Sequence, residues 1–414
     1  MVDFQQFTLD NGLRVVVHED PDVQIAVVNI LYNVGSRDEN PEKTGFAHLF
    51  EHLMFGGSVN IPDYDEELQK IGGENNAFTS PDITNYYMTL PAQSLETGFW
   101  LESDRMLALN FNPDVLEVQR KVVIEEFKQR YLNQPYGDVW LKLRPLAYHQ
   151  HPYQWPTIGK DIRHIEDATM EQVRDFFYTH YRPDQAILVV AGNVNFEEVR
   201  LLADKWFGPI PSGKGYVRNL PAEPRQHEYR RLECSAEVPS DALYMCFHVP
   251  GRFDDGYYAA DLLSDIIGRG KSSRLYSALV SQQNLFTSIN AYMTGSLDPG
   301  LLVISGQLAS GISIEKGETA VFEILDKLKQ EALTAEEVEK VRNQAESTLV
   351  FGEVEVLNRA MNLAVHTLNG DTAGINREAE LIRAVTAKDI SAAAEKFIRT
   401  ENCSVLHYHK DNHQ

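Results

Sequence analysis

The pattern His-x-x-Glu-His at residues 48–52 constrains this chain more than any other feature of its sequence. It lies in an apolar stretch, residues 45–55, which a pair of glycines follows, and this arrangement predicts a short buried helix. On such a helix His48 and His52 are four residues apart and project from the same face. Because buried imidazole and carboxylate groups require partners, these side chains are expected to meet a polar or charged group.

The three polar side chains of this pattern are the parts of a zinc hydrolase. His48 and His52 supply two neutral nitrogen ligands, and Glu51 supplies a base for a water that the pair would hold. Their order is that of the inverted zincin signature. The alternative is an ordinary pair of histidines whose ring nitrogens form hydrogen bonds with groups in the core or with solvent. A motif this short needs structural context, and the context required here is a third ligand.

Residues 114–130 offer two candidates for that ligand. The segment has no glycine or proline, an acid in its first turn and a basic end, so it predicts a helix. Glu125 and Glu126 lie against its apolar centre on neighbouring stripes, and helical geometry alone does not choose between them. The alternative is that both acids are ordinary solvated residues.

Residues 120–126, Arg-Lys-Val-Val-Ile-Glu-Glu, resemble a second motif of the pitrilysin family of zinc peptidases. That family includes insulin-degrading enzyme and the mitochondrial processing peptidase, and its bacterial members of about this length are two-domain subunits. In the family, a later helix with the pattern Arg-x-Val-Val-x-x-Glu supplies the third ligand. The resemblance implies that Glu126 binds one zinc ion together with His48 and His52, and that Glu51 is the catalytic base.

Residues 72–80 carry a second part of the resemblance. In the family, an Asn-Ala-Phe-Thr strand edge lies beside the metal and pairs with the backbone of the substrate. The resemblance therefore implies that Asn76, Ala77 and Phe78 bind substrate. For Asn76 the alternative is a turn or strand-edge asparagine without such a role.

The chain departs from the family at Gln119. Many relatives have an acid at this place, seven residues before the glutamate ligand. In those relatives the acid interacts with the metal ligands rather than with the metal itself. A glutamine still forms hydrogen bonds but carries no charge, so we expect the metal affinity or the basicity of the ligand to be tuned differently.

The composition limits the class of protein. The chain has 414 residues, enough for two domains, and a formal net charge of −22, which disfavours binding to nucleic acids and to anionic membranes. Its three cysteines are widely spaced, without a Cys-x-x-Cys pattern, which argues against a disulfide framework and a thiolate zinc site. The first residues resemble no signal peptide and no long apolar run follows, so a cytoplasmic protein is expected, or a periplasmic one if a leader was removed.

The order of the expected elements predicts two α+β domains. A linker rich in glycine and proline at residues 211–227 separates an N-terminal zinc-binding catalytic domain, residues 1–210, from a related C-terminal domain without metal ligands, residues 228–414. The resemblance adds that the two domains form the halves of a clam-like subunit. The expected strands cover residues 13–18, 25–32, 84–90, 186–192, 242–248 and 403–406, and the expected helices residues 64–71, 94–109, 113–132, 169–181, 257–267 and 387–398.

The second half repeats the pattern of the first but loses the ligands. In this alignment Asp261, Ser264 and Asp265 take the places of His48, Glu51 and His52. The repeat explains why a duplicated chain would carry one metal site.

Together these features predict a zinc-dependent metalloendopeptidase. It would hydrolyse peptides or unfolded segments bound as an extended strand, with Glu51 as general base on the zinc-bound water. Two alternatives are a non-catalytic or assembly subunit of a peptidase-like complex, and a structural zinc site. The intact ligands and base argue against the first, and a base beside a ligand has no purpose in the second.

One part of the family's substrate site is missing from the sequence. Single-chain relatives contribute an arginine and a tyrosine, seven residues apart, from the later half. Val280 and Thr287 occupy these places here, and Arg274 and Tyr276 are nearby at a different spacing. The resemblance therefore implies a related second subunit that supplies the pair in trans, as in a heterodimer, with a homodimer as the alternative.

Overall fold

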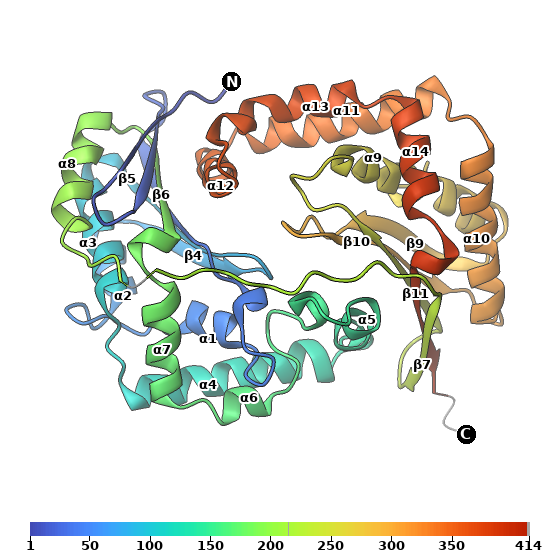
Figure 1. Cartoon of the computed structure of the whole chain (residues 1–414), viewed down its shortest axis with the longest axis horizontal. Coiled ribbons are helices and arrows are strands. Elements are labelled where there is room, and N and C mark those ends of the chain that lie inside the picture. The colour runs from blue at the N-terminus through green and yellow to red at the C-terminus, as the bar shows by residue number, and fades with distance from the viewer. Residues whose placement is uncertain (214, 412–414) are drawn as a thin grey trace. The chain divides into compact units, whose positions relative to one another are not determined.

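The computed structural model of the chain describes residues 1–213 and 215–411. Contacts between its residues divide it into two units, each with one mixed sheet and its own helices (Figure 1). This confirms the predicted α+β class with two domains. Unit 1 contains Met1–Lys128, Trp155–Pro221 and Val350–Arg377, and unit 2 contains Gln129–Gln154, Ala222–Leu349 and the chain from Glu378 onward.

The sheet of unit 1 has the strand order β1-β2-β6-β3-β5-β4, in which β2 and β6 are parallel and all other neighbours antiparallel. The central strand β6 is buried along its whole length, as expected for an apolar strand covered by other elements. The strands are β1 (Gln5–Thr8), β2 (Arg14–Glu19), β3 (Ile25–Tyr32), β4 (Glu74–Thr79), β5 (Thr84–Pro91) and β6 (Ala186–Gly192).

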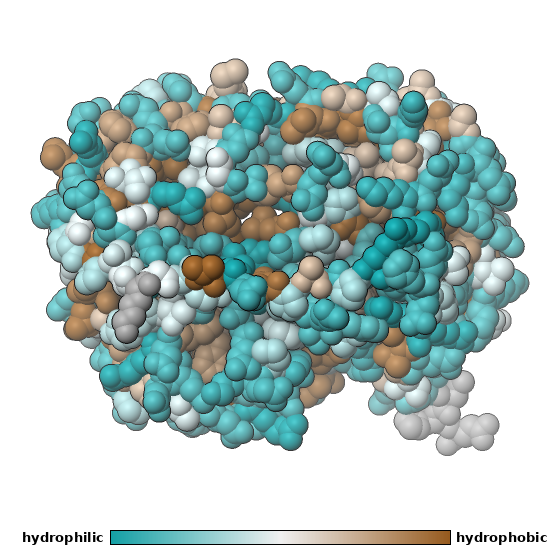
Figure 2. Space-filling view, viewed as in Figure 1, coloured by the Kyte–Doolittle hydropathy of each residue, from teal (hydrophilic) through white to brown (hydrophobic). Residues whose placement is uncertain are grey.

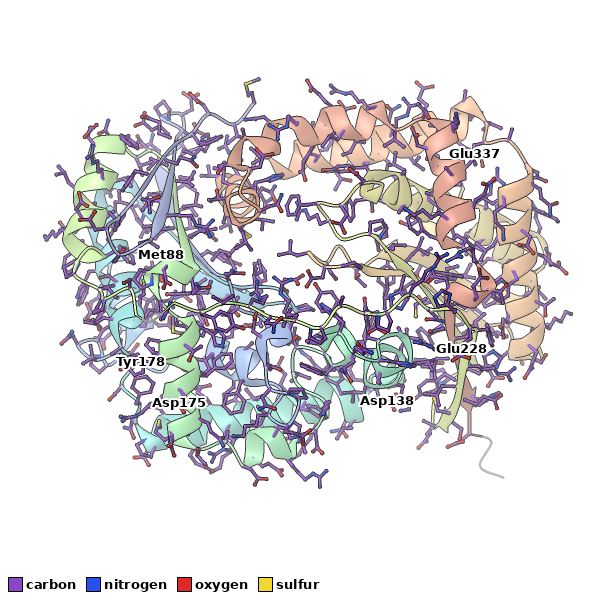
Figure 3. The ribbon with its side chains drawn as sticks, viewed as in Figure 1. Met88, Asp138, Asp175, Tyr178, Glu228 and Glu337 are labelled. Atoms are coloured by element: carbon purple, nitrogen blue, oxygen red, sulfur yellow. The ribbon has the colours of Figure 1, made fainter. Side chains whose placement is uncertain are left out.

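Helices pack closely on this sheet. Helix α3 can approach β5 because Gly98 has no side chain; a Cβ there would lie 3.0 Å from the Sδ atom of Met88, which Figure 3 labels. Helix α12 packs on β3 and β6. The helices of unit 1 are α1 (Phe46–Leu53), α2 (Tyr64–Lys70), α3 (Leu95–Leu107), α4 (Pro113–Phe127), α6 (Arg163–Glu166), α7 (Met170–His180), α8 (Phe196–Trp206) and α12 (Val356–Leu368).

The sheet of unit 2 has the order β7-β11-β8-β10-β9, in which β7 and β11 are parallel. Its strands are β7 (Arg230–Ala236), β8 (Ala242–Val249), β9 (Phe286–Met293), β10 (Gly300–Leu308) and β11 (Cys403–Lys410). The helices of this part of the chain are α5 (Val139–Ala147), α9 (Tyr257–Gly268), α10 (Ile314–Gln330), α11 (Ala335–Gly352), α13 (Glu378–Ala384) and α14 (Ala387–Phe397).

The two sheets share one topology. If the extra edge strand β1 is set aside, β2, β6, β3, β5 and β4 correspond in order and direction to β7, β11, β8, β10 and β9. The helices before β6 and β11 even begin with the same capping box, at Thr169 in α7 and Thr386 in α14. The sequence repeat is therefore a repeat of the fold.

The units differ from the predicted domains 1–210 and 228–414 because each receives a helix from the other half of the sequence. The segment 129–154, with α5, lies in unit 2, where α5 packs on β7, β8 and β11. The segment 350–377, with α12, lies in unit 1. The chain therefore crosses between the units several times, and residues 211–227 contain only one of the crossings.

The structure also corrects the alignment of α1 with α9. Both helices follow a central strand and begin after a glycine in the left-handed conformation, Gly45 with φ 92° and Gly256 with φ 87°. Counted from these glycines, the counterparts of His48, Glu51 and His52 are Ala259, Leu262 and Leu263, two residues before the aligned Asp261, Ser264 and Asp265. The repeat lacks the ligands in either alignment.

The surface visible in Figure 2 is mostly hydrophilic, in keeping with the net charge of −22, and the hydrophobic residues on it are scattered in small groups. Among the helices of the described residues, none combines the length and the hydropathy that crossing a membrane requires.

Candidate metal centre

The helix that carries the sequence motif starts at a strongly held N-terminus. The carboxylate of Glu39, which is 6% exposed, accepts the backbone N–H groups of Gly45 at 2.9 Å and Ala47 at 2.8 Å. It also accepts the indole N–H of Trp155 at 3.1 Å. A side-chain acceptor at this end satisfies free backbone donors, so Glu39 fixes the first turn of α1.

Burial raises the pKa of Glu39 to about 8, and the hydrogen bonds from Ala47, Gly45 and Trp155 act against this rise. Burial disfavours the charged form of the carboxyl group more than the three hydrogen bonds favour it, so the pKa remains above its ordinary value.

Aromatic side chains fix the rest of α1. The ring of Phe50, on the face opposite the ligands, stacks on Tyr181 at 5.1 Å and tilts against Phe176 at 5.0 Å, both from α7 and its end. The Tyr86 hydroxyl of β5 donates to the Phe50 carbonyl at 3.2 Å. The helix is therefore held between α7 and the sheet, which leaves little freedom for the residues that flank Phe50.

Within this frame the structure brings together His48, His52 and Glu126. The Nε2 atoms of His48 and His52 lie 3.6 and 3.4 Å from Oε2 of Glu126, and the three candidate ligand atoms all lie within 4.8 Å of one another. In a tetrahedral zinc site with bonds of about 2.0–2.1 Å, neighbouring ligand atoms are about 3.3 Å apart. The donor atoms and their spacing therefore fit a zinc ion. Among the described residues no other group of three His, Cys, Asp or Glu side chains could hold a metal.

The packing of α4 distinguishes the two glutamates that helical geometry left equivalent. The Glu126 side chain is 17% exposed and faces the histidines, whereas that of Glu125 is 61% exposed and pairs with Lys128 at 2.7 Å. Gln119 is half-buried on the same face of α4, two turns before Glu126, and within the described chain no hydrogen bond joins it to the candidate ligands. In this structure Gln119 therefore does not orient a candidate ligand through a direct hydrogen bond.

Glu51 lies between the two histidines in sequence and contacts a strand. Its Oε2 atom accepts a hydrogen bond of 2.6 Å from the hydroxyl of Thr79, the last residue of β4. The sequence analysis included Thr79 only as part of the Asn-Ala-Phe-Thr motif, without a role of its own, and did not identify Glu39. Alternation along the β4 segment would have placed Thr79 on the same face as Ala77, but its partner on α1 depends on the tertiary structure.

The predicted substrate residues lie on β4, the end strand of the sheet of unit 1. Asn76 and Phe78 are exposed and Ala77 is half-buried. The backbone N–H of Ala77 donates to the side-chain Oδ1 of Asn76 at 2.8 Å, so this donor does not serve the pairing with β5. At Ala77 the side chain of the neighbouring residue therefore takes up the backbone donor.

In unit 2 the described residues at the places of the family's arginine and tyrosine have other roles. Val280 is half-buried, and the Thr287 hydroxyl donates to the Gln307 carbonyl at 3.2 Å. The nearby Arg274 binds Glu337 of α11, labelled in Figure 3, through hydrogen bonds of 2.9 and 3.2 Å. Arg274 is therefore engaged within its own unit.

Comparison with known proteins relates the chain to one family of peptidases. Residues 14–159 match the family described as Insulinase (Peptidase family M16), and residues 167–345 match the Peptidase M16 inactive domain. The zinc protease PqqE of Helicobacter pylori is 28% identical over 97% of this chain and 92% of its own length. An uncharacterised zinc protease of Bacillus subtilis, YmxG, is 26% identical over 86% of each chain.

Solved structures show the same fold. The crystal structure of a protease from Helicobacter pylori has a TM-score of 0.92 at 27% identity and covers 99% of this chain and 100% of its own. The structure of a peptidase M16 inactive domain from Pseudomonas fluorescens has a TM-score of 0.89 at 16% identity and covers 100% and 99%.

Proposed function

The chain belongs to the M16 family of peptidases, and on this premise we propose that it is a zinc-dependent metalloendopeptidase. The observation that carries the proposal is the convergence of His48, His52 and Glu126, two nitrogen atoms and one oxygen atom, from α1 and α4. Three protein ligands leave one coordination position open, which is typical of catalytic rather than structural zinc.

When bound, zinc lowers the pKa of a water toward about 7 and polarises a carbonyl group. Glu51, adjacent to His52, accepts the proton of the attacking water and passes it to the leaving amine. The hydrogen bond from Thr79 holds this carboxylate on the side of α1 that faces β4.

The substrate is a peptide or an unfolded segment that adds to β4 as a further strand. Hydrogen bonds to the backbone of Ala77 supply the binding, and Asn76 releases the Ala77 N–H to the substrate when it binds. Backbone pairing tolerates many side chains, so we expect a broad cleavage preference with contributions from the exposed Phe78.

A related second subunit supplies the missing arginine and tyrosine, with a homodimer as the alternative. Removal of donors that stabilise the developing negative charge costs about 3 kcal/mol. Val280 has no side-chain donor, the Thr287 hydroxyl donates to the Gln307 carbonyl, and Arg274 is bound to Glu337. We therefore expect the isolated chain to be slow and an assembled form to be fast. Full activity of a proven monomer would contradict this part of the proposal.

The substitution Glu51→Gln tests the function. It keeps the shape of the side chain and all three ligands but removes the base, so we expect one zinc per chain by metal analysis and no cleavage of a quenched-fluorescence peptide library. His52→Ala is the matched variant and should lose the metal as well. Undiminished cleavage by Glu51→Gln would remove the proposed base, and absence of zinc from the native chain would remove the proposal as a whole.

A further inference from the structure

We propose that Thr79 is a positioning residue that couples the addition of a substrate strand at β4 to the alignment of Glu51. The inference rests on the proposed function and deepens it. Its basis is the hydrogen bond of 2.6 Å from Thr79 Oγ1 to Glu51 Oε2, which joins the substrate-binding strand to the proposed base.

The position of Thr79 in β4 makes this link possible. Burial alternates along the strand: residues 75, 77 and 79 are half-buried, and residues 74, 76 and 78 are exposed. Thr79 thus shares the inner face with Ala77, two residues before it, and this face packs against α1. The residue whose backbone pairs with substrate and the residue that holds the base are neighbours on one rigid strand.

The chemistry of the contact favours one orientation of the carboxylate. A hydroxyl that donates to an ionised acid forms a short, charge-assisted bond, which restricts rotation of the Glu51 carboxylate about its last torsion angle. The bond engages Oε2 of Glu51 and so fixes the plane of the carboxylate. Threonine suits this task because its branched side chain has few rotamers.

Substrate binding acts through the backbone of β4. A free edge strand has one neighbour, here β5, and a substrate strand becomes its second neighbour. Pairing at Ala77 therefore restrains the position of Thr79, and with it the orientation of Glu51. A substrate whose backbone pairs fully with β4 therefore holds Glu51 in the aligned orientation, whereas a poorly paired substrate leaves Glu51 free to rotate.

Thr84 provides a matched control. It is the cross-strand partner of Thr79 in the β4–β5 pairing and is fully buried. Its hydroxyl donates to the Val34 carbonyl at 3.0 Å, an ordinary structural bond. Replacement of either threonine by valine removes one hydroxyl from the same part of the sheet, but only one of these hydroxyls holds Glu51.

The test compares Thr79→Val, Thr79→Ser and Thr84→Val in the assembled protein, with zinc content, kcat and KM for a quenched peptide, and a crystal structure of each variant. We expect Thr79→Val to keep one zinc per chain and a near-native KM but to lower kcat by about 10- to 100-fold. Its Glu51 carboxylate should leave the position seen here. Thr79→Ser should restore both kcat and carboxylate position. Thr84→Val should lower the thermal midpoint without changing kcat.

A double-mutant cycle separates positioning from general structural damage. In the Glu51→Gln background the hydroxyl has no base to align, so Thr79→Val should cause no further loss in the residual rate. Native kcat and an unmoved carboxylate in Thr79→Val, or a serine variant that fails to rescue, would overturn this inference alone. A native protein that binds zinc but cleaves no peptide would overturn the proposed function, and the inference with it.

Discussion

Helices α1 and α9 are counterparts in two copies of one fold, yet among the described residues only α1 of the two contributes to a group of three side chains that could hold a metal. Each follows a central strand of its sheet, β3 or β8, and each begins after a left-handed glycine. At the positions of His48 and His52, α9 has Ala259 and Leu263, both buried in the core of unit 2. The fold itself therefore needs only apolar residues at these places, and the histidines of α1 serve another purpose.

The helices that face α1 and α9 show the same contrast. In unit 1, His52 of α1 meets Glu126 of α4. In unit 2, the corresponding helices α9 and α11 are joined by Arg269, which binds Asp265 at 3.0 Å and Thr348 at 3.2 Å. A guanidinium group of the chain itself thus connects the second helix pair, whereas the first pair brings together the candidate ligand atoms of His48, His52 and Glu126.

The largest expected effect is the loss of metal from unit 1 alone. His52→Ala removes a ligand and should reduce bound zinc from one per chain to near zero, with a fall in peptidase activity of at least about 1,000-fold. Asp265→Asn, on the counterpart helix, should leave the zinc content unchanged. Metal analysis of both variants tests this contrast. Loss of zinc in Asp265→Asn would contradict the restriction of metal binding to unit 1.

The next effect concerns the N-terminus of α1. Glu39→Ala leaves the buried N–H donors of Gly45 and Ala47 without their acceptor, whereas the Trp155 indole N–H keeps the Ser36 carbonyl, so we expect a loss of about 3 kcal/mol in unfolding free energy. Hydrogen exchange of the α1 amides should rise. In unit 2, Asp254→Ala removes a single bond to the Gly251 N–H and should cost about 1 kcal/mol. Equal losses in the two variants would contradict the special support of α1.

A pH effect of intermediate size is expected in unit 1. Burial lowers the pKa of His180 to about 4, with Asp38 opposing the shift and Arg218 and Arg182 reinforcing it. The folded protein keeps this histidine neutral, while the unfolded chain protonates it below about pH 6.5. Stability therefore falls as the pH drops from about 6.5 to 4, by up to about 3 kcal/mol.

His180→Gln cannot titrate and should flatten this part of the curve of unfolding free energy against pH, measured by urea denaturation. Burial also lowers the pKa of His248 in unit 2, so a smaller acid-dependent loss should persist in the variant. An unchanged slope between pH 6.5 and 4 would assign the acid sensitivity to other groups.

The smallest effect concerns the bridge in unit 2. Arg269→Gln removes the link between α9 and α11, but the arginine side chain is 40% exposed, so solvent weakens the pair and we expect a loss of about 1 kcal/mol. Zinc content and kcat should stay native. A loss of zinc in this variant would show that the two helix pairs are not independent.

Some elements could be predicted from sequence because their signals are local. Strand β3 was predicted at residues 25–32, where it lies, since a run of mainly aliphatic and β-branched residues, interrupted only by Asn29, marks a buried strand. Helix α1 was predicted from its apolar flanks and the glycines that follow it. The position of α12 in unit 1 could not be predicted in this way, because an apolar helix face indicates burial but not the sheet on which the helix packs.

The candidate site shows the same limit. The motif identified His48, His52 and Glu51, but the choice of Glu126 over Glu125 needed the resemblance, because both lie on adjoining stripes of one helix. The packing of α4 turns Glu126 toward the histidines and leaves Glu125 in solvent. The contacts of Thr79 and Glu39 could not be predicted, because the partner of Thr79 is distant in sequence and the partners of Glu39 include backbone groups.

The sequence by itself determined the chemistry available to this protein: two imidazoles and an acid on one helical turn, a repeated α+β pattern and a second half without ligands. These features depend on the spacing of neighbouring residues, which the chain carries with it. Only the tertiary structure shows that Glu126, which the resemblance had implied, faces the histidines, that β4 contacts Glu51, and that α12 packs on the sheet of unit 1. Each of those outcomes depends on how helices and strands pack, since packing alone brings together groups that the sequence keeps apart.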